Sequence, residues 1–379
     1  MHVRVRIGLA SLVLAALICA APAAARSVPR GFYGAVYDGA VADAPADVQD
    51  AQFARMAESG VESVRAVFSW ADAQPVAGGA FDFSRTDQLV TLADQHGMSL
   101  LPVVIYTPVW ARADQTESAS PPKRRGDYTA YLRALAQRYG SSGSFWQAHP
   151  ELHKRPLRYW QIWNEPHLRL YWNASHWQRG YGALLRASRV ALRQADPHSR
   201  VVLAGLTGAS WDALKSLYKL GKVKRAFDIA ALQTYTGTVR HLLAAIHLFR
   251  GVLAAHGAAR MPLWLTEMGW PAAKGRTKVP VYQRTIATTD SGMAKKLTAG
   301  YAMLAHVRRS RRALVSRAFW YSWASPYVRS NDAGTGIFRF AGLFRFDKGA
   351  FSAKPALRAY VRSARAHEGC AKTATATCR

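Results

Sequence analysis

The sequence is poor in acidic residues and in cysteine, and it lacks a long hydrophobic run. Its 379 residues include 51 lysines and arginines but only 23 aspartates and glutamates, which gives a formal net charge of +28, and it has three cysteines. The apolar run from Ile7 to Ala20 is too short for a comfortable membrane span, so we expect none. Half of the residues are apolar, enough to bury one large core or two modest ones.

Several motifs of enzyme chemistry are also absent. The sequence has no glycine-rich phosphate loop and no serine nucleophile elbow. His153, His167 and His176 lie within one stretch, but no cysteine or carboxylate stands at ligand spacing from them. We therefore expect no metal site and no cofactor, and ordinary surface or supporting roles for these histidines.

The first 25 residues have the pattern of a secretory signal peptide. Arg4 and Arg6 precede the apolar run, and Ala23-Ala24-Ala25 supplies the small residues of a cleavage site. The sequence therefore predicts export, with a secreted or extracytoplasmic location. Cleavage would remove Cys19; lipid attachment at Cys19 is an alternative that the preceding Ile18 disfavours.

Two cysteines remain in a short tail, residues 367–379. In an oxidising compartment Cys370 and Cys378 would most simply pair with each other. Such a bond closes a short terminal loop and constrains little of the chain before it. The predicted organisation is a signal peptide (1–25), one domain (26–366) and this tail (367–379).

Apolar runs of strand length alternate with segments of helical periodicity. The predicted strands cover residues 32–37, 61–69, 98–106, 157–163, 200–205, 228–233, 261–267 and 315–322. The clearest helical segments cover residues 128–139, 176–195, 241–256 and 293–309. Eight such alternations fit an α/β fold of the (β/α)8, or TIM, barrel type better than an open doubly wound sheet. The active site of such a barrel forms at the carboxyl ends of its strands.

Two of the predicted strands run into a glutamate. Glu165 stands in Trp163-Asn164-Glu165-Pro166 after the fourth strand, and Glu267 ends the seventh in Thr266-Glu267-Met268-Gly269-Trp270-Pro271. Burial of a carboxyl group raises its proton affinity, which suits an acid/base catalyst. Taken alone, Glu165 could instead be a carboxylate stabilised by a helix dipole. Two glutamates that both stand at the carboxyl end of a strand favour catalysis, because cleavage of a glycosidic bond needs one protonated and one ionised carboxyl.

The two motifs resemble the acid/base and nucleophile motifs of clan A glycoside hydrolases. The similarity extends over nearly the whole chain after residue 30, and it is greatest to family 39, with family 5 close behind. It implies a retaining double displacement, in which the carboxyls lie about 5 to 5.5 Å apart and Glu267 attacks the anomeric carbon. Glu165 would protonate the departing oxygen and then activate the water that releases the sugar.

The resemblance implies roles for further side chains. Arg65 would hydrogen-bond the nucleophile carboxylate and keep it ionised, and Tyr235 would donate a second hydrogen bond to it. Asn164 would bind the sugar 2-hydroxyl. Stacking on sugar faces is expected from Trp110, Trp270 and Trp323. The alternatives are an ion-pairing arginine, a loop tyrosine without a role, and tryptophans that pack in the core.

The excess of positive charge predicts affinity for polyanions. The candidates are uronic-acid polysaccharides, teichoic or other envelope phosphates, and nucleic acid; an anionic polysaccharide is the expected partner, without specific nucleic-acid binding. The alternative is a solvated surface that reflects a biased coding composition. The cluster Arg308, Arg309, Arg311 and Arg312 lies outside the expected barrel and fits surface attachment.

The leading functional hypothesis is a secreted, monomeric, retaining O-glycosyl hydrolase that cleaves a poly- or oligosaccharide, with an acidic or envelope glycan as one candidate substrate. A basic polysaccharide-binding protein on an inactive barrel, or a transglycosylase, are the alternatives.

Overall fold

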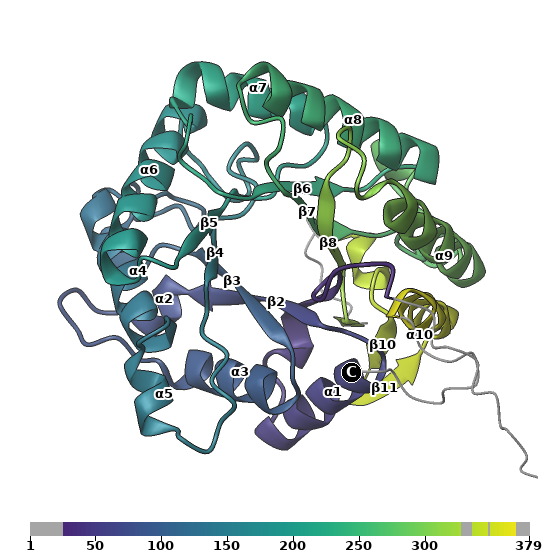
Figure 1. Cartoon of the computed structure of the whole chain (residues 1–379), viewed down its shortest axis with the longest axis horizontal. Coiled ribbons are helices and arrows are strands. Elements are labelled where there is room, and N and C mark those ends of the chain that lie inside the picture. The colour runs from purple at the N-terminus through teal and green to yellow at the C-terminus, as the bar shows by residue number, and fades with distance from the viewer. Residues whose placement is uncertain (1–25, 327–335, 348, 369–379) are drawn as a thin grey trace, which may run out of the picture.

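The computed structural model describes residues 26–326, 336–347 and 349–368, and within them the chain forms a (β/α)8 barrel (Figure 1). The predicted signal peptide and the predicted Cys370–Cys378 pair lie outside the described residues. The barrel strands are β1 (Tyr33–Tyr37), β2 (Ser63–Ser69), β3 (Ser99–Ile105), β4 (Tyr159–Ile162), β5 (Arg200–Val202), β6 (Ala230–Thr234), β7 (Leu263–Met268) and β8 (Val315–Trp320). The predicted fold is therefore confirmed.

Parallel pairing runs through the whole sheet in the order β5-β4-β3-β2-β1-β8-β7-β6. Between the two ends of this order, β5 and β6, the contact is reduced to isolated parallel bridges, Val202 with Ile229 and Leu206 with Leu232. The seam between β5 and β6 is therefore the least extensive in the barrel.

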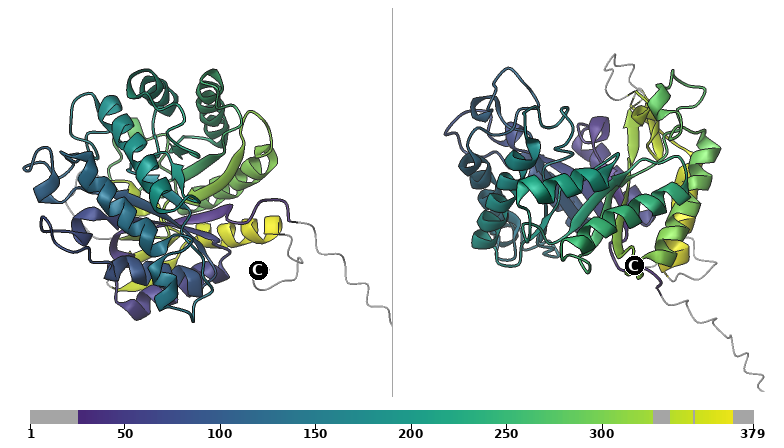
Figure 2. Two further views of the ribbon diagram at one scale, coloured as in Figure 1. Left: turned by 60° about the vertical axis from the view of Figure 1, so that its left-hand side comes forward. Right: turned by 90° about the horizontal axis from the view of Figure 1, so that it is seen from above.

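Helices enclose the strands on the outside, as Figures 1 and 2 show. They are α1 (Ala46–Glu58), α3 (Ser84–Gln95), α4 (Arg125–Tyr139), α6 (Trp177–Ala195), α7 (Ser210–Gly221), α8 (Val239–Ala255), α9 (Asp290–Val307) and α10 (Pro355–Glu368), with the short α2 (Trp70–Ala73) and α5 (Ser144–Ala148) in connections. Because both faces of the strands are covered, β1 and β7 are buried along their entire length, as expected of a parallel sheet. No helix among the described residues is long and apolar enough to cross a membrane.

A small sheet follows the eighth barrel strand. Its strands are β9 (Ala324–Pro326), β10 (Phe344–Asp347) and β11 (Ala350–Ala353), with β10 parallel to β9 and antiparallel to β11. It leads directly into α10, which begins at Pro355 and packs against α9. The Tyr33 hydroxyl of β1 donates to the Ser363 carbonyl of α10 at 2.9 Å, so the last helix is joined to the first strand.

Candidate active site

Both glutamates are delivered to the same end of the barrel. Glu267 belongs to β7, and Glu165 lies in the turn that follows β4. Arg65 lies in β2, and Gln233 near the end of β6, with Tyr235 just beyond it. Since the strands are parallel, their carboxyl ends meet at one mouth, and these five side chains converge there.

The Glu267 carboxylate receives three hydrogen bonds from side chains of β2, of β6 and of the segment that follows β6. Arg65 Nη1 and Gln233 Nε2 each donate to its Oε1 at 2.8 Å, and the Tyr235 hydroxyl donates to its Oε2. Burial raises the pKa of Glu267 above its ordinary value, while the Arg65 charge and the Tyr235 hydrogen bond oppose that rise. The positive charge and the donors favour the ionised form that a nucleophile requires.

Arg65 is the centre of this network. Its Nε donates to Gln161 Oε1 at 2.7 Å and its Nη2 donates to Asn164 Oδ1 at 2.8 Å. Gln233 Nε2 also donates to Asn164 Oδ1, at 2.8 Å. The guanidinium therefore links three strands, and because both contacts to Asn164 use the amide oxygen, the amide NH2 stays available for a ligand.

Glu165 has a different environment from Glu267. Burial raises its pKa well above the ordinary value, the negative charge of Glu267 adds to the rise, and Arg65 opposes it. The turn that carries it has left-handed backbone at Trp163 (φ 69°) and at Glu165 itself (φ 39°). Such residues are uncommon outside glycine and gather at functional sites, where the surroundings hold them in place. A buried carboxyl that keeps its proton beside an ionised one is the pairing required of an acid and a nucleophile.

The structure does not bring the three predicted tryptophans to this network. Trp323 is 0% exposed, and its indole donates to Gln52 Oε1 of α1 at 3.1 Å. Trp270 is 1% exposed and donates to the Thr236 carbonyl at 2.5 Å. Both rings are enclosed in the core, so in this structure neither offers a face to a sugar.

Trp110 is only partly buried, but it also belongs to a packing cluster. Its indole donates to the Gln74 carbonyl at 2.9 Å, and its ring lies edge-on to Trp70 at 5.5 Å. It does not line the cavity at the barrel mouth. For these tryptophans the structure favours core packing, the alternative that the sequence left open.

A third carboxyl, Asp38, lies at the mouth directly after β1 and was missed from the sequence. The Tyr321 hydroxyl, directly after β8, hydrogen-bonds to it. Burial raises the pKa of Asp38 to about 7, with a further contribution from Glu267 and an opposing one from Arg65. The rule that pointed to the two glutamates, a polar residue at the end of an apolar strand, would have found Asp38 as well.

A cavity of about 570 Å³ opens at the mouth, and its lining includes Asp38 but neither Glu165 nor Glu267. Asp38, Tyr106, Trp163 and Tyr171 contribute to its lining, together with the charged residues Asp43, Asp72, Arg85 and Arg112. Tyr106 is the exposed aromatic of this group, at 42%. The charge of Glu267 contributes to the raised pKa values of Tyr106 and Tyr171, two of the lining residues. Aromatic and polar groups together are the usual lining of a pocket for a polar ligand.

Histidines do not complete a metal site here. The described residues contain no group of three or more histidines, cysteines or carboxylates arranged to hold a metal ion. Burial lowers the pKa of His167 to about 4, so this histidine is neutral.

Comparison with known proteins gives a consistent class. A family model described as beta-galactosidase, of glycoside hydrolase family 42, matches residues 42–124, and no curated protein matches. A family 39 glycoside hydrolase from the gut symbiont Bacteroides cellulosilyticus WH2 superposes with a TM-score of 0.65 at 16% identity, over 89% of this chain and 64% of that one. The chain thus spans less than two thirds of that relative.

Two further solved structures of glycoside hydrolases have a similar fold. A family 39 beta-xylosidase from Caulobacter crescentus gives a TM-score of 0.63 at 19% identity, over 89% of this chain and 72% of that one. A GH5_18 protein from Streptomyces cattleya, in complex with GlcNAc, gives a TM-score of 0.65 at 18% identity, over 93% of this chain and 83% of that one. The fold is that of clan A glycoside hydrolases, as the two glutamate motifs predicted, and families 39 and 5 are both among its structural neighbours.

Proposed function

We propose that this protein is a retaining glycoside hydrolase with Glu267 as nucleophile and Glu165 as acid/base. The observation that carries the proposal is the contrast between the two carboxyls. Arg65, Gln233 and Tyr235 hold Glu267 with three donors, while burial and the charge of Glu267 keep the proton on Glu165.

In the first step, an oxygen of Glu267 attacks the anomeric carbon and the leaving oxygen takes the proton of Glu165. The glycosyl ester removes the negative charge of Glu267, and the pKa of Glu165 therefore falls. Glu165 then acts as the base that activates water, and attack of this water releases the sugar. The free NH2 of Asn164 suits a hydrogen bond to the sugar 2-hydroxyl, which strengthens as positive charge develops on the ring.

The substrate is a poly- or oligosaccharide, and the cavity with Tyr106 at its entrance supports a site for at least one further sugar unit. Export to the cell exterior is part of the proposal, supported by the pattern of residues 1–25. The charge of the mouth does not favour an acidic glycan as the substrate. The described connections that follow β1 to β7 carry seven acidic and eight basic residues, so the mouth is close to neutral.

The test compares two substitutions on aryl glycosides with good and poor leaving groups. Glu267→Gln should lower kcat/KM by roughly 10³-fold or more on every substrate, because the covalent step is lost. Glu165→Gln should lower it by about 10²- to 10⁴-fold for poor leaving groups, and far less for activated aryl groups, which leave without a proton. Glu117→Gln, an exposed glutamate between β3 and α4, is the matched control and should behave as the wild type.

Equal activity in the wild type and in Glu267→Gln would refute the assignment of Glu267 as the nucleophile and favour a polysaccharide-binding barrel. The anomeric configuration of the first product, followed by proton NMR, must be that of the substrate. Addition of acceptor sugars separates hydrolysis from transglycosylation, since only the latter gives longer products as the main outcome.

A further inference from the structure

The face opposite the active-site mouth carries a clear excess of positive charge. That face is built from the segments that lead into the barrel strands, residues 26–32, 59–62, 96–98, 149–158, 196–199, 222–229, 256–262 and 308–314. They contain thirteen lysines and arginines against four aspartates and glutamates. The connections at the mouth are close to neutral, while the segments at the opposite end of the barrel are strongly basic. The positive charge is therefore not spread evenly over the surface.

The four acidic residues of this face are already engaged. Glu62 pairs with Arg26, Asp228 pairs with Arg189 and Arg193 of α6, and Glu151 is hydrogen-bonded to His149 at 3.0 Å. The fourth, Asp196, is buried and accepts hydrogen bonds from Ser141. Glu62 and Asp228 are therefore paired with the half-buried arginines Arg26, Arg189 and Arg193, and not with the exposed cations of this face.

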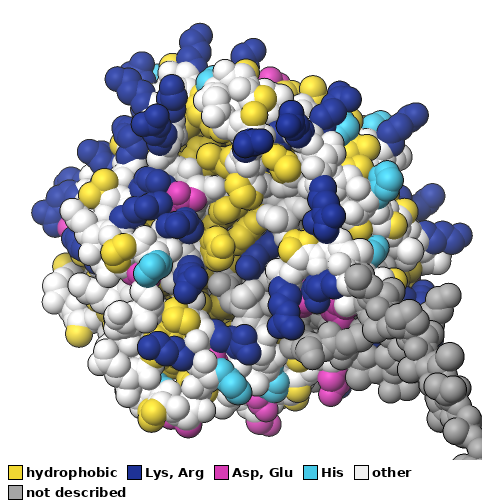
Figure 3. Space-filling model, in the orientation of Figure 1, with side chains coloured by type: hydrophobic (Ala, Val, Ile, Leu, Met, Phe, Trp, Pro, Cys, Tyr) yellow, Lys and Arg dark blue, Asp and Glu magenta, His cyan; other side chains and the backbone are white. Residues whose placement is uncertain are grey.

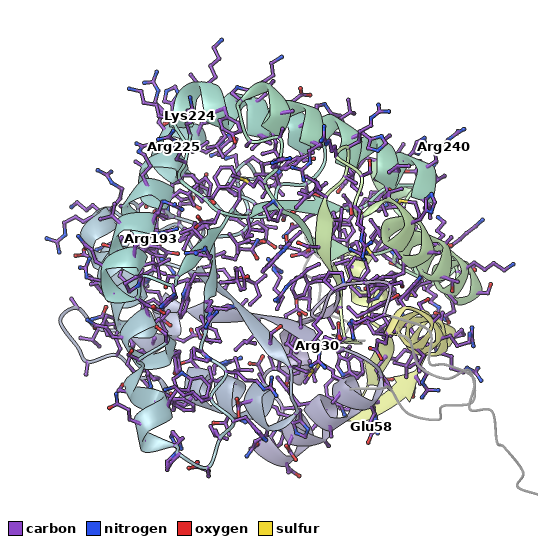
Figure 4. The ribbon with its side chains drawn as sticks, viewed as in Figure 1. Arg30, Glu58, Arg193, Lys224, Arg225 and Arg240 are labelled. Carbon is purple, nitrogen blue, oxygen red and sulfur yellow. The ribbon has the colours of Figure 1, made fainter. Side chains whose placement is uncertain are left out.

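Ten of the basic side chains are exposed, and no carboxylate among the described residues lies within ion-pair distance of them. They are Arg30, Lys154, Arg158, Lys222, Lys224, Arg225, Arg260, Arg309, Arg311 and Arg312. Figure 3 shows dark-blue side chains around this face and only a few acidic ones. In Figure 4, Arg30 lies in the central part of the face, while Arg193, Lys224 and Arg225 lie along the edge formed by α6 and α7. We call these ten residues the basic face.

Two hollows lie within this face. The first, of about 350 Å³, is surrounded by Arg26, Arg30, Arg155 and Arg317, with Glu62 as its one carboxylate. Arg317 comes from β8 and points into the lower end of the barrel, where its Nη1 donates to Ser63 and Ser99 at 3.0 Å. Its guanidinium also lies 4.5 Å from the ring centre of Trp264, so serines and an aromatic face hold this cation in place without a carboxylate.

The second hollow, of about 600 Å³, lies between the carboxyl ends of α6, α7 and α8. Its exposed cations are Lys224, Arg225 and Arg260. Its aromatic rings are closed to stacking, because Phe227 is buried and Tyr218 is stacked on His256 at 4.2 Å. Two cationic hollows on one face give an extended anionic chain two places to dock.

We propose that the basic face binds an acidic polysaccharide, whose carboxylates enter the two arginine-lined hollows while the catalytic mouth stays free. Arginine predominates among the ten cations, and its planar guanidinium matches a carboxylate with two parallel hydrogen bonds. A polyuronate carries one carboxylate on each sugar and so matches a row of separate cations. The choice of a polysaccharide over other polyanions rests on the proposed glycosidase function.

Two observations argue against the other polyanions. Single-stranded nucleic acids stack their bases on open aromatic rings, which neither hollow offers. An anionic membrane favours exposed apolar side chains beside the cations, and none of the exposed large hydrophobic residues lies in the segments that form this face.

The test measures binding to polygalacturonate, with dextran as the neutral polymer, at low and at physiological salt. The wild type should bind polygalacturonate and not dextran, and salt should weaken the binding. Lys224→Glu/Arg225→Glu, in one hollow, and Arg30→Glu, in the other, should each weaken it about tenfold or more. The matched control is Arg179→Glu/Arg240→Glu, two exposed arginines in the first turns of α6 and α8, on the mouth side of the barrel. It changes the net charge as much as the first variant and should weaken binding less than about threefold.

Equal losses in the control and in Lys224→Glu/Arg225→Glu would overturn the proposal, since net charge alone would then explain the affinity. Unchanged binding in both basic-face variants would overturn it too. Tighter binding to RNA or to phosphatidylserine vesicles, lost through the same substitutions, would exclude a polysaccharide as the partner. Hydrolysis of aryl glycosides should be unchanged in every variant; absence of hydrolysis in the wild type would refute the proposed function and leave the binding result standing.

Discussion

Asp38 is a third carboxyl at the mouth, and the Tyr321 hydroxyl is its hydrogen-bond partner. Its pKa of about 7 means that in the folded protein the carboxyl keeps its proton until near neutrality. Protonated, it can donate a hydrogen bond to a sugar oxygen as well as accept one from Tyr321. The site therefore has a third carboxyl whose charge changes within the ordinary working range.

Asp38→Asn should stabilise the protein more at pH 8 than at pH 4. Between pH 4 and pH 7 the unfolded chain releases the Asp38 proton while the folded protein keeps it, so wild-type stability falls as the pH rises through that window. Asparagine has no proton to lose, and its gain should reach on the order of 2 kcal/mol above pH 7. Chemical unfolding at pH 4, 6 and 8 measures this. A gain that is the same at all three values, or a larger gain at pH 4, would contradict the assignment.

At the level of residues, the sequence located the carboxyls better than the aromatics. Glu165 and Glu267 could be predicted because polar residues at the ends of apolar strands in a parallel barrel lie at its mouth. Arg65, Asn164 and Tyr235 were expected from the resemblance to clan A glycoside hydrolases. Trp323 was expected to stack on a sugar, yet β8 ends at Trp320 and the Trp323 ring is buried in the core. A tryptophan fits a core as well as a sugar site, and only the packing around it decides between the two.

At the level of elements, the seam between β5 and β6 closes the barrel and also positions a side chain of the active site, Gln233. Gly205 follows β5, and a Cβ at this position would lie 2.5 Å from Nε2 of Gln233. The same Nε2 donates to both Asn164 and Glu267. The absence of a side chain at residue 205 thus lets β6 place Gln233 in the network.

Gly205→Ala should therefore impair catalysis more than folding. The new methyl group would displace the Gln233 amide, and we expect kcat to fall about tenfold through the loss of one donor to Glu267. KM should change less, and the melting temperature by only a few degrees. Gly251→Ala is the control, because its Cβ would meet no atom within 4 Å and alanine favours the α8 helix. Wild-type kcat in Gly205→Ala would show that Gln233 has no part in positioning the nucleophile.

All eight barrel strands could be predicted because each is an apolar run bounded by turns and followed by a helical segment. The small sheet β9-β10-β11 was not predicted. Its strands have three or four residues, too few for a periodic pattern, and they pair with segments up to twenty residues apart. Helix α10 begins at Pro355, and proline is well suited to a first helical turn.

For the whole molecule, a net charge of +28 is a source of self-repulsion as well as of affinity. Raising NaCl from 0.01 to 0.15 M shortens the Debye length from about 30 Å to about 8 Å, so repulsion across the basic face should weaken. We expect the melting temperature to rise by a few degrees over this range. Differential scanning fluorimetry is the measurement, with Lys224→Glu/Arg225→Glu as the comparison. This variant should gain less from salt, and an equal gain would show that the repulsion lies elsewhere.

The backbone NH of Ser27 donates to the carbonyl of His367 at 2.9 Å, so the first and last described segments touch each other. Both lie where the chain enters β1 and leaves α10, on the side of the barrel away from the mouth. A tag, a solid support or another folded unit joined next to residue 26 or residue 368 would therefore lie on the side of the barrel away from the mouth. The same proximity makes the chain suitable for circular permutation, with a short linker between residues 368 and 26 and new ends in an exposed loop.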